Sequence, residues 1–212
     1  MGDLKVKVFD QAEVTQSLLE DLKPVLDSAY FHSQMFENLI ADLEDDESGV
    51  KAFVLYENSE VVSFCATKHR RDFIDKYNFL NEENCRNLCR VVTRRGHRSK
   101  GHGSYLKKEI IEYYKNNSSI SYLLWATSEV GAMKFYLENG AYVDMNSVEG
   151  FSDLNSAKEN LTHWWELVNN KRLKEYRIKN VNIFFSQPVA INASDFLFQN
   201  NFLQIKSVRK LL

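Results

Sequence analysis

The chain has 212 residues, enough for one large domain or for one domain with an appendage. Hydrophobic residues make up 44% of it and only 2 residues are proline, which excludes a disordered or linker-rich protein. The formal net charge of −2 excludes a general nucleic-acid footprint, and 3 cysteines cannot build a disulfide framework. No apolar run approaches the ~18 residues of a membrane span. Because MGDLKVKVFD also lacks the apolar core of a signal peptide, we expect a cytoplasmic protein.

Hydrophobic periodicity predicts an order of strands and helices along the chain. The first part is expected to hold a strand over 4–10, helical segments over 11–30 and 31–43, and a hairpin of strands over 50–58 and 60–69. Pro24 should kink or divide the first helical segment. The second part is expected to hold a strand over 87–94, a helix over 102–117, a strand over 121–128, a short helix over 131–140 and a strand over 141–148. The remainder should add a helix around 153–177, a strand over 181–187, a short helix over 192–201 and a strand over 202–208.

The stretch HRSKGHGSYLKKEII lies between a predicted strand and a predicted helix. It places Gly101 and Gly103 two residues apart, beside Arg98 and Lys100. Backbone N–H groups in such a turn, together with the positive end of the following helix, bind anions. A P-loop is excluded because no Gly-Lys-Ser/Thr is present, and a dinucleotide fingerprint is excluded because Leu106 stands where its third glycine is needed. The local chemistry therefore predicts a phosphate or pyrophosphate site.

The pattern Arg98-x-x-Gly101-x-Gly103 resembles the acetyl-CoA signature of the GNAT superfamily of N-acetyltransferases. The superfamily's second signature places an Ala, a Tyr and a Gly at intervals of four residues, and here these are Ala132, Tyr136 and Gly140. The predicted order of elements from 4 to 148 also follows that of the superfamily. The resemblance implies an α/β (α+β) fold, in which a central, mixed, twisted sheet is flanked by helices. The C-terminal helix and strand–helix–strand unit would be additions to that fold.

The resemblance implies acetyl-CoA as co-substrate and suggests roles for particular residues. The backbone of the signature strand would hold the pantetheine amides and the thioester oxygen through Val91, Val92 and Thr93. The pyrophosphate would lie against the turn formed by Arg98, Ser99, Lys100, Gly101, His102, Gly103 and Ser104. Tyr136 would protonate the leaving thiolate. The ordinary alternatives are a buried strand, a basic surface turn and a tyrosine packed on a helix face.

Transfer to an amine with a pKa of ~10.4 requires a base that removes a proton. The sequence does not single out this base. Glu129 is a candidate, but it also fits a solvated carboxylate at a helix start, and it stands where the superfamily often has an Asn that contacts the cofactor. His97 and His102 flank the turn and are interpreted as turn residues. Two further departures from the family pattern are Arg95, in place of a proline, and Ala141, in place of a phenylalanine.

The acceptor pocket of the superfamily is built from the segments that correspond here to 30–48 and 70–86. Within the first of them, the acidic run DLEDDE over 42–47 could attract a cationic amine or form a solvated loop. No metal site is expected, because two cysteines and a nearby histidine do not make a zinc site; these residues are Cys85, Cys89 and His69.

We therefore predict an N-acyltransferase, with acetyl as the expected group, that acts on a small-molecule or peptide amine. Residues 1–149 would form the acetyl-CoA-binding catalytic domain, and 150–212 an extension packed on it. That extension is either an unrelated addition or a degenerate partial repeat, since VGAMKFYLENGAYV and INASDFLFQNNFLQ align without a gap. The alternative function is a non-catalytic CoA-binding or regulatory module. No nucleic acid is expected as partner, because a toxin acting on aminoacyl-tRNA would need a basic surface. No membrane partner is expected either, and a homodimer is left open.

Overall fold

The computed structural model describes residues 2–29, 34–70, 74–75, 77–127, 130–144, 147, 183–190, 193–200 and 202–204. These residues fall into two compact units, one ending at Ile120 and the other beginning at Ser121. Within the described ranges, no helix is long and apolar enough to cross a membrane.

The first unit is built on an antiparallel sheet whose strands follow one another in chain order: β1 (Leu4–Asp10), β2 (Lys51–Glu57), β3 (Glu60–Lys68) and β4 (Cys85–Thr93). The hairpin between β2 and β3 turns on Asn58 and Ser59, whose φ angles are 51° and 71°. A tight two-residue hairpin turn that matches the twist of its strands needs two such left-handed residues. The predicted hairpin across these two residues is confirmed.

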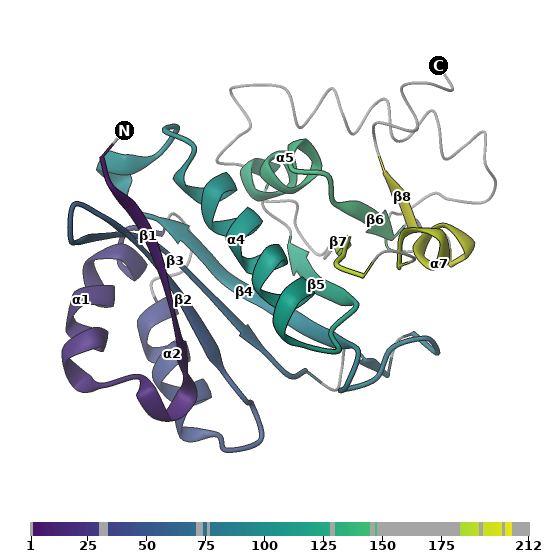
Figure 1. Ribbon diagram of the computed structural model, residues 1–212, viewed down its shortest axis with the longest axis horizontal. Coiled ribbons are helices and arrows are strands. Elements are labelled where there is room, and N and C mark those ends of the chain that lie inside the picture. Colours follow the sequence, from purple (N-terminus) through teal and green to yellow (C-terminus); the bar gives the residue numbers. More distant parts are fainter. Residues whose placement is uncertain are drawn as a thin grey trace. The chain divides into compact units, whose positions relative to one another are not determined.

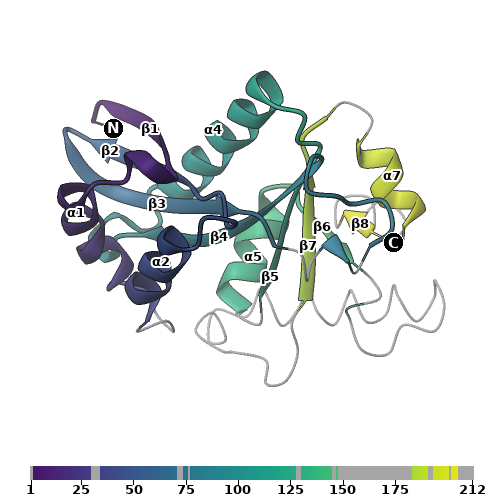
Figure 2. The same cartoon turned by 90° about the horizontal axis from the view of Figure 1, so that it is seen from below.

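Helices cover both faces of this sheet (Figure 1 and Figure 2). One face carries α1 (Gln16–Leu26), which follows the short 3-10 helix η1 (Gln11–Glu13), and α2 (Met35–Glu44); the other carries α4 (His102–Asn117). Pro24 lies inside α1, which continues past it to Leu26. The core between α1, α2 and the sheet includes the fully buried side chains of Leu22, Leu26, Leu39, Val54 and Phe64.

Helix α4 packs on its face of the sheet through side chains spaced by one helical turn. Leu106, Ile110 and Tyr114 are buried. The ring of Tyr114 lies 5.9 Å from that of Phe53, and its hydroxyl forms a hydrogen bond with Thr67. This stripe is the pattern from which the helix was predicted, and the observed helix has the predicted bounds, 102–117. The packing holds the first turn of α4 in place at the end of the basic glycine turn.

In the second unit four strands pair antiparallel with one another: β5 (Tyr122–Thr127), β6 (Tyr142–Asp144), β7 (Ile183–Pro188) and β8 (Phe202–Gln204). Strand β7 pairs with β5 and also with β6, and β6 pairs with β8 as well. Helix α5 (Val130–Glu138) follows β5, and α7 (Ala193–Gln199) lies in sequence between β7 and β8. A strand from the C-terminal part of the chain therefore separates β5 from β6.

The prediction of an α/β fold is confirmed. The predicted strand–helix–strand unit after residue 180 is observed as β7, α7 and β8. The helix predicted around 153–177 lies outside the residues that the structure describes.

Candidate functional site

Strand β4 carries an irregularity beside the residues predicted to bind the cofactor. The register of β3 against β4 shifts between Phe64 and Ala66. Two residues of β4, Arg90 and Val91, therefore lie opposite the single residue Cys65, which defines a β-bulge. Arg90 has a φ of 51°. A residue other than glycine adopts this conformation only where its surroundings stabilise it.

The contacts that stabilise Arg90 come from helix α2. Its Nη2 donates to the carbonyl oxygen of Asn38 at 2.6 Å and pairs with Oδ2 of Asp42 at 2.5 Å. The other carboxylate oxygen of Asp42 pairs with Nζ of Lys68 at 2.7 Å. Asp42 belongs to the acidic run over 42–47, but both of its carboxylate oxygens are paired with basic side chains of the protein, whereas residues 44–47 of the run are exposed. Asp42 differs from the rest of the acidic run because it lies on α2 against basic residues of β3 and β4.

After β4 the chain forms a 3-10 turn, η2 (Arg95–His97), and reaches α4 through residues 98–101. Ser99 and Gly101 have left-handed backbones, with φ of 63° and 85°. Gly101 is the N-cap of α4, and its carbonyl oxygen accepts the N–H of Tyr105 at 2.9 Å. A Cβ placed on Gly101 would meet no atom within 4 Å. The glycine therefore satisfies a backbone requirement and also leaves open space beside the turn.

The side chain of Arg98 turns back into the protein. Its Nε donates to the carbonyl oxygen of Thr93 at 2.9 Å, and its Nη2 donates to the carbonyl oxygen of Ser28. These bonds tie the turn to the end of β4 and to the residues that follow α1. Arg98 thus shapes the turn from inside, and direct contact with phosphate stays a prediction.

The turn before α4 and the first turn of that helix have the properties of a site for the predicted pyrophosphate of acetyl-CoA. The N–H groups of His102, Gly103 and Ser104 lie in the first turn of α4, where an α-helix offers no internal acceptor. The helix dipole favours negative charge at this end. Lys100 is exposed on the turn and adds positive charge. The open space beside Gly101 allows an anion to approach the backbone.

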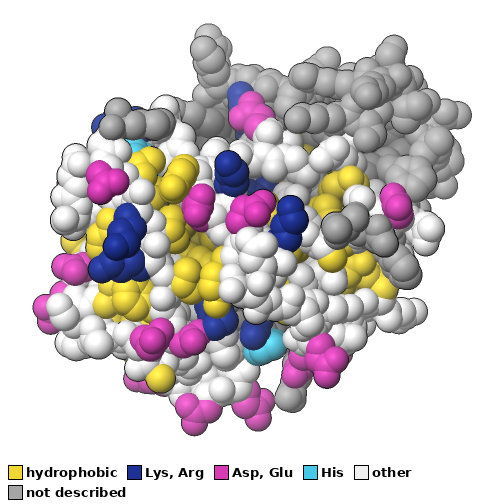
Figure 3. All heavy atoms as spheres, in the orientation of Figure 1, with side chains coloured by type: hydrophobic (Ala, Val, Ile, Leu, Met, Phe, Trp, Pro, Cys, Tyr) yellow, Lys and Arg dark blue, Asp and Glu magenta, His cyan; other side chains and the backbone are white. Residues whose placement is uncertain are grey.

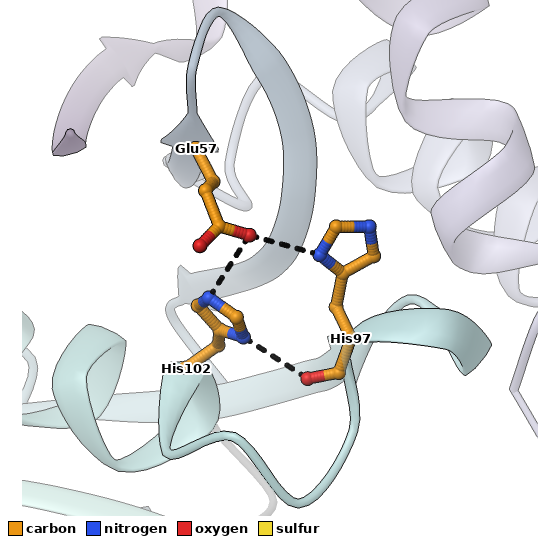
Figure 4. A group of neighbouring side chains, drawn as sticks. All are labelled: Glu57, His97 and His102. Atoms are coloured by element: carbon orange, nitrogen blue, oxygen red, sulfur yellow. Dashed lines mark hydrogen bonds and ion pairs between the residues drawn. The ribbon is translucent and has the colours of Figure 1, made fainter. Parts of the chain in front are cut away.

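Two histidines bracket the turn and face the same carboxylate (Figure 4). Oε2 of Glu57 lies 3.1 Å from Nδ1 of His97 and 3.4 Å from Nε2 of His102. Nδ1 of His102 donates to the carbonyl oxygen of His97 at 3.0 Å. Desolvation alone would raise the pKa of the Glu57 carboxyl. That pKa nevertheless lies below the usual value, because Glu57 accepts hydrogen bonds from His97 and from the N–H of Gly2 and lies near the charge of His102. Sequence analysis missed this cluster because Glu57 stands 40 residues before His97.

The second signature lies in the second unit, at the end of α5. The φ of Gly140 is 81°, its N–H donates to Leu137 at 3.2 Å, and the N–H of Ala141 donates to the carbonyl oxygen of Tyr136 at 3.1 Å. This pair of bonds is a Schellman motif, which explains the glycine four residues after the tyrosine. Tyr136 is buried, with 7% of the residue exposed, and the centre of its ring lies 4.4 Å from that of Trp125. The acid role of its hydroxyl stays a prediction.

Burial sets the protonation of several groups in the first unit. It raises the pKa of the Cys85 thiol to about 12. It also raises the pKa of the thiols of Cys65 and Cys89. The cysteines are therefore protonated at neutral pH and are poor nucleophiles. Burial also lowers the pKa of Lys107, on α4, to about 7.

The predicted cofactor-binding residues of the first unit fall on consecutive parts of the chain. Val91–Thr93 end β4, and Arg98–Ser104 form the turn and the start of α4. Glu129 lies outside the residues that the structure describes, as do 30–33 and 71–73 of the predicted acceptor segments. On the face drawn in Figure 3, Lys and Arg side chains are interspersed with Asp and Glu. Among the described residues, no extended basic patch covers that face.

Comparisons with known proteins show which class of structures has this fold. Solved structures with the same fold include a GNAT-family protein from Desulfovibrio desulfuricans (TM-score 0.57, 13% identity, covering 89% of this chain and 100% of that one). A second is a GNAT-family acetyltransferase from Staphylococcus aureus Mu50 (TM-score 0.53, 13% identity, covering 89% of this chain and 100% of that one). A third is GCN5 from Tetrahymena (TM-score 0.54, 13% identity, covering 89% of this chain and 96% of that one). At these identities the likeness shows the fold alone. A search of curated proteins gives no match.

The family itself is shown by sequence. The profile of the acetyltransferase (GNAT) family matches residues 15–141, more than half of the chain, and the protein belongs to this family. Acetyltransferases of the GNAT family use acetyl-CoA as co-substrate.

Proposed function

We propose that the protein transfers an acetyl group from acetyl-CoA to a primary amine by direct attack. The observation that carries this proposal is the turn before α4. Its left-handed Gly101 leaves open space where an anion can approach the backbone. The turn also lies within residues 15–141, over which the family profile matches.

The residues that would hold the co-substrate lie along one stretch of the first unit. The backbone of Val91, Val92 and Thr93 would contact the pantetheine amides and the thioester oxygen. The side chain of Ser63 helps to fix this stretch, because its Oγ donates to the carbonyl oxygen of Val92 at 2.8 Å. The pyrophosphate would be held by Arg98, Ser99, Lys100, Gly101, His102, Gly103 and Ser104.

Direct attack is favoured by the state of the cysteines. Acetyl-CoA supplies an acetyl group already activated as a thioester. An acyl-enzyme route through cysteine would need a thiolate nucleophile. The chain has 3 cysteines, and burial raises the pKa of each. The acceptor amine, once neutral, would therefore react without an acyl-cysteine intermediate.

Tyr136 would act as the general acid that protonates the departing CoA thiolate. Its place in the second family signature supports this role. A tyrosine hydroxyl is protonated at neutral pH, so it can donate a proton to the sulfur. General acid catalysis of this kind contributes ~10²–10⁴ in rate.

The proposal includes the organisation of the chain. Residues 1–149 would carry the acetyl-CoA site and 150–212 an extension packed on them. The acceptor would be a small-molecule or peptide amine, and a homodimer is compatible with the proposal.

The test is CoA release, followed with a thiol reagent, when the full chain is given acetyl-CoA and a panel of amines. The panel should include polyamines, aminoglycosides, and peptides with a free N-terminus or lysine. We expect turnover with at least one acceptor. If calorimetry detects CoA binding but no amine gives turnover, the protein is a non-catalytic CoA-binding module instead.

A further inference from the structure

Glu57, His97 and His102 bring together one potential metal-ligand atom each (Figure 4). Oε2 of Glu57, Nδ1 of His97 and Nε2 of His102 all lie within 4.8 Å of one another. Zinc bonds of ~2.0–2.2 Å in a tetrahedron place neighbouring ligand atoms roughly 3.3 Å apart. The two distances from the carboxylate oxygen, 3.1 Å and 3.4 Å, are already close to this value.

The hydrogen bond made by Nδ1 of His102 leaves Nε2 of the same ring free to coordinate a metal ion. Nδ1 carries the hydrogen that is donated to the carbonyl oxygen of His97. In the neutral ring, Nε2 is then an acceptor, and it faces a carboxylate oxygen, which is also an acceptor. The side chain of His102 is 1% exposed, and its Nε2 is buried 3.4 Å from Oε2 of Glu57, with which it forms an ion pair only when the ring carries a second proton. Two acceptors in contact at a buried place require a proton or a metal ion between them.

The surroundings of His102 match those of a metal-binding histidine. Such a histidine donates its second ring N–H to a carbonyl or carboxylate, which fixes the tautomer. For His102 that acceptor is the carbonyl oxygen of His97. For His97, Nε2 lies 3.9 Å from Oε2 of Glu60, at the start of β3. Each ring therefore has one nitrogen directed at Glu57 and the other near an oxygen acceptor.

From this geometry we propose that Glu57, His97 and His102 bind a divalent transition-metal ion, with Zn²⁺ as the best match. Two imidazoles and one carboxylate suit zinc, whereas Mg²⁺ and Ca²⁺ prefer oxygen ligands throughout. Three protein ligands leave a fourth position for water. Access is available, because the side chains of Glu57 and His97 are 17% and 20% exposed.

The metal would link three elements of the first unit, since its ligands come from the end of β2, from η2 and from the first residue of α4. His97 and His102 lie on either side of residues 98–101, so the ion would hold both ends of the basic glycine turn. The proposal differs from the sequence expectation of no metal, which considered only Cys85, Cys89 and His69. Metal binding itself does not depend on the acetyltransferase activity.

The test uses the full chain, freed of metal with a chelator and titrated with ZnCl₂ in a calorimeter. We expect one equivalent to bind, and Glu57→Gln and His97→Gln each to weaken its affinity at least tenfold. His69→Gln is the matched control, because His69 lies outside the cluster, and it should bind as the wild type does. Circular dichroism checks that each variant is folded.

Ring-nitrogen NMR locates the ion without any substitution, which matters because the chain has 5 histidines. One equivalent of Zn²⁺ should shift Nδ1 of His97 and Nε2 of His102, with the opposite nitrogen of each ring protonated. If the wild type binds no zinc, or binds it with the shifts of both rings unchanged, the proposal is wrong. Retention of wild-type affinity in the two ligand variants would overturn it as well.

Discussion

The guanidinium of Arg98 and the carbonyl oxygen of Thr93 are joined by a hydrogen bond of 2.9 Å, which ties the basic glycine turn to the end of β4. A second bond reaches the carbonyl oxygen of Ser28. The arginine of the family signature therefore supports the turn from inside, in addition to the pyrophosphate contact proposed for it. Its neighbour Lys100 is exposed, and the two residues should behave differently when they are replaced.

We expect Arg98→Ala to destabilise the fold by roughly 1–3 kcal/mol, because two carbonyl oxygens lose a charged donor. Lys100→Ala should leave the melting temperature unchanged and weaken CoA binding through lost charge alone, so that its effect shrinks at high salt. Thermal melting and calorimetry at two salt concentrations measure both effects. Equal melting temperatures for the two variants would contradict the internal role of Arg98.

Gly103→Glu should abolish CoA binding, since it adds a side chain and a negative charge where the pyrophosphate is proposed to lie. Gly96→Glu is the matched control. Gly96 is exposed in η2, and a Cβ there meets no atom within 4 Å. The same charge is thus added nearby but outside the proposed contact. Unchanged CoA affinity in Gly103→Glu, measured by calorimetry, would remove the turn from the site.

Local patterns predicted the elements well because they depend on neighbouring residues. The stripe of Leu106, Ile110 and Tyr114 marks one face of α4, and Asn58-Ser59 marks the hairpin turn. The bulge at Arg90 had no such signal, because its left-handed backbone depends on contacts with Asn38 and Asp42 from another element.

Pairings between distant parts of the chain were not predictable from periodicity. The strand over 181–187 was predicted, but its position between β5 and β6 depends on the order of the sheet. The cluster around Glu57 is a similar case. Only the folded chain brings Glu57 to His97 and His102.

Tyr136→Phe should lower turnover by ~10²–10⁴, the usual contribution of a general acid, while CoA binding stays near that of the wild type. The ring keeps its packing on Trp125, so the fold should be preserved. Tyr122→Phe is the control for the loss of a buried tyrosine hydroxyl, because it removes the hydroxyl of another buried tyrosine of the second unit. Full activity in Tyr136→Phe would exclude Tyr136 from the mechanism.

Lys107 should make stability depend on pH. Burial lowers its pKa from 10.5 to about 7 in the folded protein. Between these values the unfolded chain binds a proton that the folded chain does not, so this group's contribution to stability rises with pH. Lys107→Met removes that dependence.

The stability advantage of Lys107→Met over the wild type should therefore shrink by about 2 kcal/mol from pH 7 to pH 9. Urea denaturation of both proteins at the two pH values measures it. An advantage that is constant across this range would show that Lys107 keeps an ordinary pKa.

Truncation after Gly150 should give insoluble or unfolded protein, because it removes β7. That strand pairs with β5 from Tyr122 opposite Pro188 to Thr127 opposite Ile183. It also pairs with β6. Without it, β5 and β6 lose the backbone hydrogen bonds that they make with β7. The buried side chains of Leu123 and Trp125 then lie beside an open sheet edge, which favours aggregation.

A chain that ends at Gln204 is the control for this truncation, since it keeps β7, α7 and β8 and should stay folded. Solubility, thermal melting and CoA binding compare the two truncations with the full chain. If the chain ending at Gly150 is soluble, melts cooperatively and binds CoA normally, then 151–212 is an independent appendage. In that case the pairing of β7 with β5 and β6 would contribute little to the stability of the sheet.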